Sequence, residues 1–379
     1  MSRFRCTAVH IALTPLAGSP IRIVRALNAH TEVAARLLTL HHYPVEQGFS
    51  FPMDLRGWVP EEMEEFRAVL DTADVIHLHH WMDLRENRLG IDLTENLRRG
   101  QRIVRQFHSN LRLVAGSAGL TEQQILEDPL PQLTLPQLHE RYYGRARVVP
   151  NIVPIDEAPY SDARPSAEGG LSVYFRPSSY GSAWSDRWET KGAPEVMRAL
   201  EWAKGSIPKI RIDAELKGIP YDEQMRRRAA CSVSIDDVVT GSFHLTSLES
   251  FAQGLAVICY LDPRQVAALT RFTGSDELPF INFAVEELPV VLDALSRNLP
   301  LVRALGERGR RWMETYWHPK AMAEHYVSAY EGLLWDGAER FDEPRFDTAD
   351  AASRWLRSEC EDLRWLVRRS RMDGAGKQG

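Results

Sequence analysis

The sequence predicts an α/β protein of two domains, each built on a parallel sheet. Its 379 residues are more than one ordinary core holds, and 44% hydrophobic with 26% charged residues is usual for a globular chain. Short apolar runs alternate with helical patterns in both halves, as strands and crossover helices do in a parallel sheet. A stretch rich in proline and glycine, at about 155–170, interrupts this alternation. We therefore expect domains at 1–160 and 161–335, followed by a helical extension at 336–379.

The first half begins with a strand, a loop and a helix. The strand covers 6–13, the loop 14–20, and the helix 21–30 carries Ile21, Val24 and Leu27 at helical spacing. A second helix is opened by Pro60, with glutamates in its first turn as an N-terminus prefers. Further strands are expected at 35–42, 74–80, 102–108 and 145–149. These strands should place Val9, Val75 and Val104 in one parallel sheet.

The second half repeats this plan. Strands are expected at 171–175, 209–216, 231–236 and 256–261, and helices at 191–204, at 221–230 and from 247 onward. They should place Val173, Ile212, Val233 and Val257 in a second sheet. The pattern from 301 to 334 predicts one continuous helix, and an amphipathic helix follows at 351–370.

Composition excludes several classes of protein. The formal net charge of −6 gives no bulk reason to bind nucleic acid. The four cysteines are far apart without a CxxC pair, which indicates free thiols and neither a disulfide frame nor a zinc site. No signal peptide or run of about 20 apolar residues is present in the sequence. We expect a cytoplasmic protein, with a peripheral location at the inner face of the membrane as a further hypothesis to test.

The most informative segment is 231–261, in which a strand, a loop, a helix opening with Glu249, a turn at Gly254 and another strand follow one another. This segment resembles the donor-binding half of the family 4 retaining glycosyltransferases, which have the GT-B fold: two Rossmann-like domains facing each other across a cleft. Glu249 matches the glutamate that binds the ribose hydroxyls of the nucleotide. The match is chemically reasonable because a carboxylate accepts two hydroxyl hydrogen bonds and a nearby helix N-terminus favours a diphosphate.

The resemblance, which covers about residues 5–335, extends to other landmarks. Arg176 and Lys191 resemble the pair that clamps the diphosphate, and Arg187 is a rival for the first role. Ser247 and Leu248, at the start of the helix of Glu249, join the expected donor-binding residues. A glycine-containing loop with Gly18 and Ser19 stands where the family places an acceptor or phosphate loop. The fold also implies that the last helix returns to pack on the first domain.

The expected catalytic residues are His108 and His244. His108 closes the strand 102–108 and matches a histidine near the reacting sugar. The first glutamate of the family falls at Gly241, which has no side chain to contact a sugar, so Asp236, Asp237 and His244 are the nearest substitutes. Each residue also has a plain structural explanation: Glu249 could cap its helix, Lys191 could be solvated, and His108 could be a hydrogen-bonded strand end.

Two histidines invite comparison with a metal site. His77 and His79 alternate along one strand and so lie on one face, but no nearby acidic residue or cysteine completes a ligand set. We expect no metal and no cofactor.

The resemblance implies transfer of a sugar from a UDP- or GDP-sugar to a hydroxyl acceptor, in surface polysaccharide or glycoconjugate synthesis. The nucleotide sugar and a glycan or lipid-linked glycan are then the expected partners, with no obligate protein partner. One alternative is that the acceptor of the sugar is modified DNA or an anionic lipid, bound in a groove lined by two basic segments. These segments are Arg98, Arg99, Arg102, Arg105 and Arg364, Arg368, Arg369, Arg371. A second alternative, motivated by Gly241, is a GT-B-like protein that binds nucleotide without transferring sugar.

Overall fold

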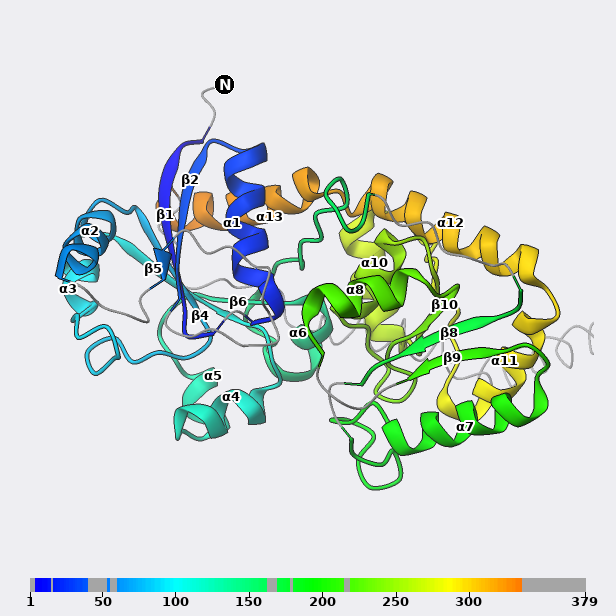
Figure 1. The fold of residues 1–379 in the computed structure, drawn as a ribbon. Coiled ribbons are helices and arrows are strands. Elements are labelled where there is room, and N and C mark those ends of the chain that lie inside the picture. The colour runs from blue at the N-terminus through cyan, green and yellow to red at the C-terminus, as the bar shows by residue number, and fades with distance from the viewer. Residues whose placement is uncertain are drawn as a thin grey trace, which may run out of the picture. The chain divides into compact units, whose positions relative to one another are not determined.

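The computed structural model describes residues 4–14, 16–39, 53–54, 60–161, 169–177, 180–214 and 219–335. These residues belong to one compact unit, Met1–Phe341, which holds two separate parallel sheets (Figure 1). The two sheets confirm the expected α/β class. The expected extension 336–379, including the helix at 351–370, lies outside the described residues.

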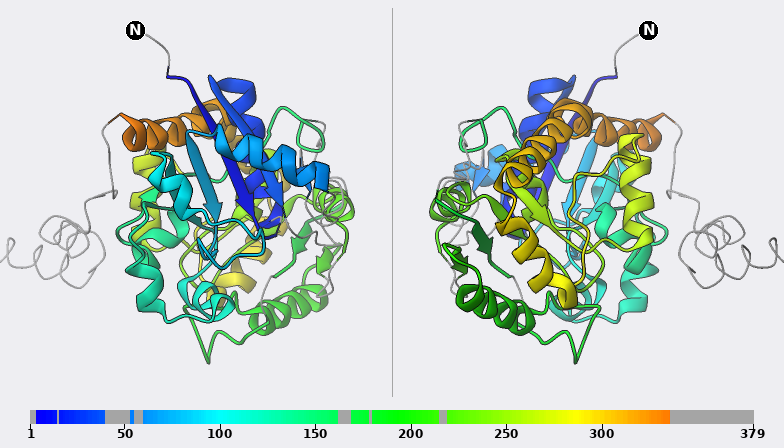
Figure 2. Two further views of the ribbon diagram at one scale, coloured as in Figure 1. Left: turned by 90° about the vertical axis from the view of Figure 1, so that its left-hand side faces the viewer. Right: turned by 90° about the vertical axis from the view of Figure 1, so that its right-hand side faces the viewer.

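The first sheet has the strand order β3-β2-β1-β4-β5-β6-β7, and every pairing is parallel. Its blue and cyan strands lie side by side in Figure 2. Val9, Val75 and Val104 share this sheet, as predicted. The strands are β1 (Cys6–Ala12), β2 (Val33–Thr39), β3 (Met53–Asp54), β4 (Val75–His79), β5 (Arg102–Phe107), β6 (Gln132–Thr134) and β7 (Arg147–Val148).

The helices of this half begin where local chemistry favours a helix start. Pro20 occupies the first turn of α1 and Pro60 opens α2, at positions where the missing backbone N–H of proline costs nothing. Asn110 caps α4 by accepting from the backbone N–H of Leu113. The helices are η1 (Leu16–Gly18), α1 (Ser19–His30), α2 (Pro60–Asp71), α3 (Thr94–Arg98), α4 (Leu111–Ala118), α5 (Glu122–Leu126) and α6 (Pro136–Tyr142).

The second sheet has the order β11-β10-β8-β9, again wholly parallel. It unites Val173, Ile212, Val233 and Val257, as predicted. Its strands are β8 (Ser172–Phe175), β9 (Arg211–Ala214), β10 (Val233–Ile235) and β11 (Ala256–Ile258). The accompanying helices are α7 (Ala193–Ser206), α8 (Tyr221–Ala229), α9 (Leu245–Ala252), α10 (Pro263–Thr273), η3 (Val285–Glu287) and α11 (Leu288–Ser296).

The continuous helix expected at 301–334 is wrong, because the segment forms two helices, α12 (Leu299–Tyr316) and α13 (Pro319–Leu334). Proline disfavours a helical conformation in the residue before it, and His318 is accordingly extended and caps α13. α13 then lies beside α1 and packs on the first sheet, where Tyr326 and Tyr330 are fully buried. The chain therefore returns to its N-terminal half through α13. The last helix, 351–370, for which this return was predicted, lies outside the described residues.

Two further properties follow from the described residues. None of their helices is both long and apolar enough to cross a membrane. Cys6, Cys231 and Cys259 are free and buried. The domain boundary at about 160 stays a prediction, although the two sheets lie on either side of it.

Candidate functional site

The candidate site is defined by the carboxyl ends of the strands, where open parallel sheets bind ligands. In the first half, Gly18 and Ser19 follow β1, and His108 follows β5. In the second half, Arg176 directly follows β8 and Asp236 directly follows β10. Several of the residues expected from the sequence therefore come from these strand ends.

The loop after β1 has a tight, left-handed backbone. Leu16, Ala17 and Gly18 have φ angles of 48°, 53° and 76°, a region that non-glycine residues rarely occupy. This conformation turns the chain directly into α1, whose first residue is Ser19. The hydroxyl of Ser19 is 3.4 Å from Oδ1 of Asn151, and Ser19 is buried. Strained backbone of this kind often lies at ligand sites.

Glu249, the expected ribose ligand, lies in a buried polar network. Its Oε1 accepts from Nη2 of Arg22 at 2.7 Å and from the hydroxyl of Tyr160 at 2.9 Å, with the hydroxyl of Tyr221 at 3.5 Å. Its Oε2 accepts from Nη1 of Arg228 at 2.9 Å. Both oxygens therefore have protein partners, and one of these, Arg22, comes from α1 in the other half of the chain.

The charges in this network support one another. Burial by itself raises the pKa of Glu249, but the guanidinium groups of Arg228 and Arg22 outweigh it, and the pKa is lowered. Burial opposes the charged form of Arg22 as well, yet Tyr160 and Glu249 outweigh burial, and the pKa of Arg22 is raised. Glu249, Arg22 and Arg228 are therefore all charged at neutral pH.

A second cluster surrounds Asp236 at the end of β10. Its Oδ1 accepts from Nζ of Lys191 at 2.7 Å, and its Oδ2 accepts from the hydroxyl of Ser247 and the backbone N–H of His244, both at 2.7 Å. The ring Nδ1 of His244 is 3.5 Å from Asp236 and 3.7 Å from Asp237. Asp236 thus links three residues that the sequence assigns to the donor site and to catalysis.

The electrostatics of this cluster resemble those of the first. Burial raises the pKa of Asp236, but Lys191 and then His244 outweigh it, so that the pKa lies well below the ordinary range of an aspartate. Burial lowers the pKa of Lys191, but the negative charge of Asp236 outweighs burial, and the pKa of Lys191 is raised. A buried, charged lysine beside the N-terminus of α9 is a suitable counter-charge for a diphosphate.

The first turn of α9 turns two side chains into the protein interior, where a ligand cannot reach them. Ser247 gives its hydroxyl to Asp236, and Leu248 packs in the core, both fully buried. Their side chains therefore offer no donor contact in this conformation. Gly241 has a φ of 77°, and a Cβ there would lie 2.8 Å from Cβ of Asp262. The turn is thus built for glycine, and a family glutamate does not fit it without strain.

The two arginines proposed for the diphosphate clamp differ in position. Arg176 is half-buried at the carboxyl end of β8. Burial raises the pKa of the neighbouring Tyr174, and the positive charge of Arg176 partly offsets this rise. Arg187 is half-exposed, pairs with Glu286 at 2.7 Å and lies over the ring of Trp184 at 5.8 Å. The position of Arg176 at a strand end favours it over Arg187 for this role, which stays a prediction.

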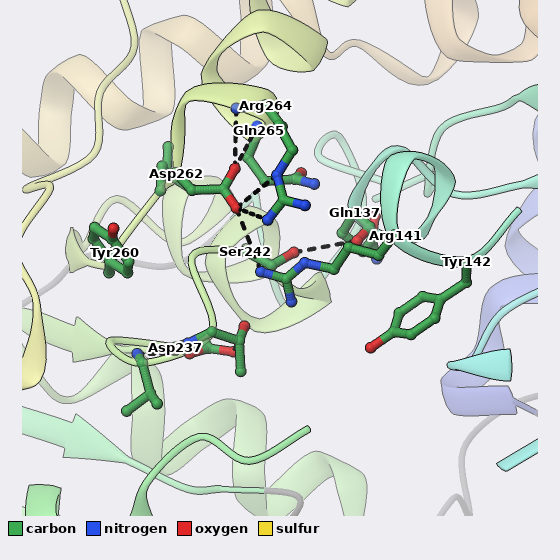
Figure 3. Close-up of polar contacts among 12 residues, drawn as sticks. Gln137, Arg141, Tyr142, Asp237, Ser242, Tyr260, Asp262, Arg264 and Gln265 are labelled. Atoms are coloured by element: carbon green, nitrogen blue, oxygen red, sulfur yellow. Dashed lines mark hydrogen bonds and ion pairs between the residues drawn. The ribbon is translucent and has the colours of Figure 1, made fainter. Parts of the chain in front are cut away.

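Contacts from α6 connect the first half to the Gly241 turn (Figure 3). Arg141 points toward Asp262, with Nη2 and Oδ2 3.5 Å apart, and the hydroxyl of Ser242 lies 3.4 Å from the carbonyl oxygen of Gln137. Asp262 in turn donates its backbone N–H to the carbonyl of Gly241 at 2.9 Å. The loop expected at the donor thus contacts the other half directly.

His108 belongs to a histidine cluster on the first sheet. Its Nε2 is 2.8 Å from Nδ1 of His79, whose Nε2 is 3.0 Å from Nδ1 of His10. Ring nitrogens of His10, His77 and His79 all lie within 4.8 Å of one another, close enough to hold a metal ion. Parallel pairing places His10 directly opposite His77. The third histidine therefore comes from a neighbouring strand, where the sequence spacing gave no sign of it.

Two important residues were not anticipated from the sequence. Arg22 stands among Ile21, Ile23 and Val24, and a charge inside such a buried run signals a buried partner. His10 likewise interrupts the apolar strand β1 and is fully buried. In both cases the signal was a polar residue in an apolar run, whereas the partner could not be named from sequence alone.

Comparisons with known proteins place this geometry in a structural class. No family model and no curated protein sequence matches the chain. Among solved structures, sucrose-phosphate synthase from Thermosynechococcus elongatus is similar with a TM-score of 0.53 at 15% identity, covering 87% of this chain and 99% of that one. These structural similarities show that the chain has a GT-B fold.

Two other similar structures contain bound nucleotide. An alpha-glucosyltransferase in complex with UDP and a 13-mer DNA containing an HMU base has a TM-score of 0.57 at 11% identity, covering 86% of this chain and 99% of that one. Anabaena HepE in complex with UDP and glucose has a TM-score of 0.51 at 10% identity, covering 87% of this chain and all of that one.

Proposed function

We propose that this protein is a glycosyltransferase that moves a sugar from a nucleotide diphosphate sugar to a hydroxyl acceptor. The observation that carries this proposal is the pair of charged clusters at the first turn of α9, at the carboxyl end of the second sheet. Lys191 and Asp236 form one cluster, and Glu249 forms the other. The GT-B fold and the nucleotide complexes of two structural neighbours support it.

In this proposal the donor binds to the C-terminal half. Lys191, Arg176 and the backbone N–H groups at the start of α9 would stabilise the charge of the leaving diphosphate, without a need for metal. Ribose hydroxyls would reach Glu249 by replacing Tyr221, whose hydroxyl is its most distant partner at 3.5 Å. Retention of configuration and a UDP- or GDP-linked donor are part of the proposal through the resemblance of 231–261.

The acceptor would lie against the N-terminal half, near Gly18, Ser19 and His108. We propose a glycan or lipid-linked glycan as its class, within polysaccharide or glycoconjugate synthesis. His244 stands beside Asp236 and Asp237 and close in sequence to Gly241, where the resembled family has the glutamate that contacts the transferred sugar. His244 is the proposed substitute for that glutamate.

Modified DNA is a second acceptor, since one structural neighbour was solved with a DNA carrying an HMU base. The basic segment expected to bind it does not form a groove of free charges. Arg105 is buried and paired with Asp128 at 2.6 Å, and Arg99 is paired with Asp71 at 2.6 Å. Arg98 is likewise paired with Glu95. The expectation that all four arginines contact an anionic acceptor is therefore wrong for Arg105, because its charge is already neutralised inside the protein.

A thermal-shift screen against UDP- and GDP-sugars tests the proposal. A ligand present at about 100 times its dissociation constant stabilises the folded protein by about 2.7 kcal/mol, which is readily measured. Each ligand that shifts the melting temperature is then assayed for release of nucleotide diphosphate, with and without glycan and HMU-containing DNA acceptors. Absence of a shift with every nucleotide sugar would overturn the proposal, whereas binding without release under any condition would leave a nucleotide-binding protein.

A further inference from the structure

A continuous chain of hydrogen bonds runs through the first sheet from His108 to His77. His108 contacts His79, and His79 contacts His10, at 2.8 and 3.0 Å. Nε2 of His10 is 3.0 Å from the hydroxyl of Tyr330, which is 2.8 Å from Nδ1 of His77. Both ring nitrogens of His10 and His79 are therefore used. β1, β4, the residue that follows β5, and α13 contribute to this chain.

All four imidazoles are neutral at physiological pH. Burial lowers the pKa of His10 to about 3, and it lowers the pKa values of His77, His79 and His108 well below the ordinary range. A neutral imidazole has one N–H donor and one acceptor nitrogen. Each ring in the chain must therefore donate in one direction and accept from the other.

Because the hydroxyl of Tyr330 has no other acceptor among the described residues, it donates within the chain, and only two arrangements of the protons remain. If Nε2 of His108 donates to His79, then Nε2 of His79 donates to His10, and Nε2 of His10 donates to Tyr330. Tyr330 then donates to Nδ1 of His77, which leaves the proton of His77 on Nε2 as well. Reversing the direction places every ring proton on Nδ1. The four rings share one tautomer in either case.

We propose that these four histidines and Tyr330 form one proton-ordered relay, with all rings protonated on Nε2, which presents Nδ1 of His108 as an acceptor for a substrate hydroxyl. Tyr330, His10, His77 and His79 are then positioning residues that act through His108. The relay itself is a property of the protein alone, whereas the role toward a hydroxyl rests on the proposed sugar transfer.

The direction of the relay is favoured at its inner end by Gln106, which acts to raise the pKa of His77 against the larger, lowering effect of burial. The amide nitrogen of Gln106 donates to Tyr326 at 3.2 Å, whereas Oε1 of Gln106 and Nε2 of His77 are both buried atoms without a hydrogen bond among the described residues. A carboxamide oxygen can only accept, so of these two unpaired atoms only Nε2 of His77 can carry a proton. At the outer end, Nδ1 of His108 is a buried atom with no partner in the described part of the chain.

A metal ion at His10, His77 and His79 is the competing explanation, since their nitrogens lie within 4.8 Å. The ring arrangement favours the relay. The rings of His77 and His79 are stacked at 4.5 Å with planes 12° apart, and those of His10 and His77 are stacked at 4.5 Å with planes 26° apart. Nδ1 of His10 and Nε2 of His79 also face each other directly at 3.0 Å, the distance of a hydrogen bond.

Nuclear magnetic resonance of the ¹⁵N-histidine-labelled parent protein tests the relay without any ligand. At about pH 8 the four ring spectra should all show the Nε2–H tautomer. A mixture of tautomers among the four rings would overturn the relay, and four Nδ1–H rings would overturn the acceptor role of His108. One equivalent of zinc in the purified protein, removable by a chelator, would also overturn the proposal because the ion needs the lone pairs that the relay uses.

Tyr330→Phe removes one hydroxyl from the relay and keeps the ring. Tyr316→Phe is the control, because the ring of Tyr316 packs against Trp312 at the end of α12, in another part of the fold. Tyr330→Phe should broaden or split the His108 signals, and it should lower kcat/KM by about two- to tenfold, the range of one neutral hydrogen bond. Identical His108 spectra in Tyr330→Phe and the parent would refute the relay. Inactivity of the parent itself would refute only the proposed function.

Discussion

Arg22 and Glu249 come from opposite halves of the chain and form an ion pair of 2.7 Å in which both side chains are almost fully buried. Arg22 lies one helical turn after the Gly18–Ser19 loop, and Glu249 lies in the first turns of α9. The loop expected at the acceptor and the carboxylate expected at the donor are therefore mechanically connected. Arg228 completes the pair from the C-terminal side at 2.9 Å.

Glu249→Gln should destabilise the protein strongly, although the sequence alone suggests that this nearly isosteric change retains the fold. The amide leaves the guanidinium groups of Arg22 and Arg228 buried without a counter-charge, and breaking such a network costs about 3–5 kcal/mol. Denaturant unfolding measures the loss. Glu307→Gln is the control, since Glu307 pairs with Arg311 at 3.9 Å on the exposed surface and its substitution should change stability little. Equal stabilities of the two variants would contradict a structural role for Glu249.

Lys191→Ala should weaken binding of a nucleotide diphosphate by about 1.5–3 kcal/mol, the range for hydrogen bonds to a charged group, which is about ten- to a hundredfold in affinity. Calorimetry with the parent's best ligand from the thermal-shift screen measures the change. Lys204→Ala, at the exposed end of α7, is the control. If Lys191→Ala and Lys204→Ala bind the nucleotide diphosphate equally well, Lys191 does not bind the diphosphate and serves only as the ion-pair partner of Asp236.

Gly241→Glu restores the glutamate of the resembled family, yet it should lower stability by about 1–3 kcal/mol. The positive φ disfavours any side chain, and the new Cβ would press on Cβ of Asp262 at 2.8 Å. Gly205→Glu is the control, because Gly205 lies in α7 with open space around its Cα and should gain helix propensity. A Gly241→Glu variant as stable as the parent would show that the turn tolerates the family residue.

Stability should begin to fall as the pH drops below about 6.5, above the range in which most carboxylates titrate. Histidines in the unfolded chain accept protons near pH 6.5, whereas burial lowers the pKa of His10 to about 3 and that of His80 to about 4. The unfolded state therefore binds more protons in this window, and stability that is complete above it is lost progressively below it. Each such group contributes up to about 1.4 kcal/mol per pH unit.

Unfolding free energies at a series of pH values test this behaviour. His80→Asn removes one of the titrating groups outside the relay, and asparagine tolerates the φ of 66° at this position. The variant should therefore show a shallower slope than the parent between about pH 6.5 and 4. A flat profile in the parent would mean that the buried histidines are protonated as easily as in the unfolded chain.

The elements were largely predictable because apolar runs and helical spacing report local structure. β6 was missed since Gln132–Thr134 is only three residues long, with Pro131 and Pro136 close on either side. The break between α12 and α13 was missed although Pro319 marked it. In both cases the local signal was present but was read over too long a window.

The site was predictable only as a set of strand ends. The family resemblance singled out Glu249 and Lys191 as candidates, but it could not show that Arg22 lies 2.7 Å from Glu249 across 227 positions of sequence. The same holds for Asp236, whose hydrogen bonds to Lys191 and Ser247 depend on how three loops meet. Partner identity is a property of tertiary packing, and no periodicity in the sequence encodes it.

The return of α13 to the first sheet has a consequence for the order in which the protein is made. His10 and His77 emerge from the ribosome long before Tyr330, the residue whose hydroxyl joins them. A fragment ending near residue 160 would leave the surface beneath α13 exposed, together with its buried imidazoles. The N-terminal half is therefore discontinuous in sequence and is completed only after the elements of the second sheet have been synthesised. Excision of either half at the linker should yield a fragment that aggregates instead of an independent module.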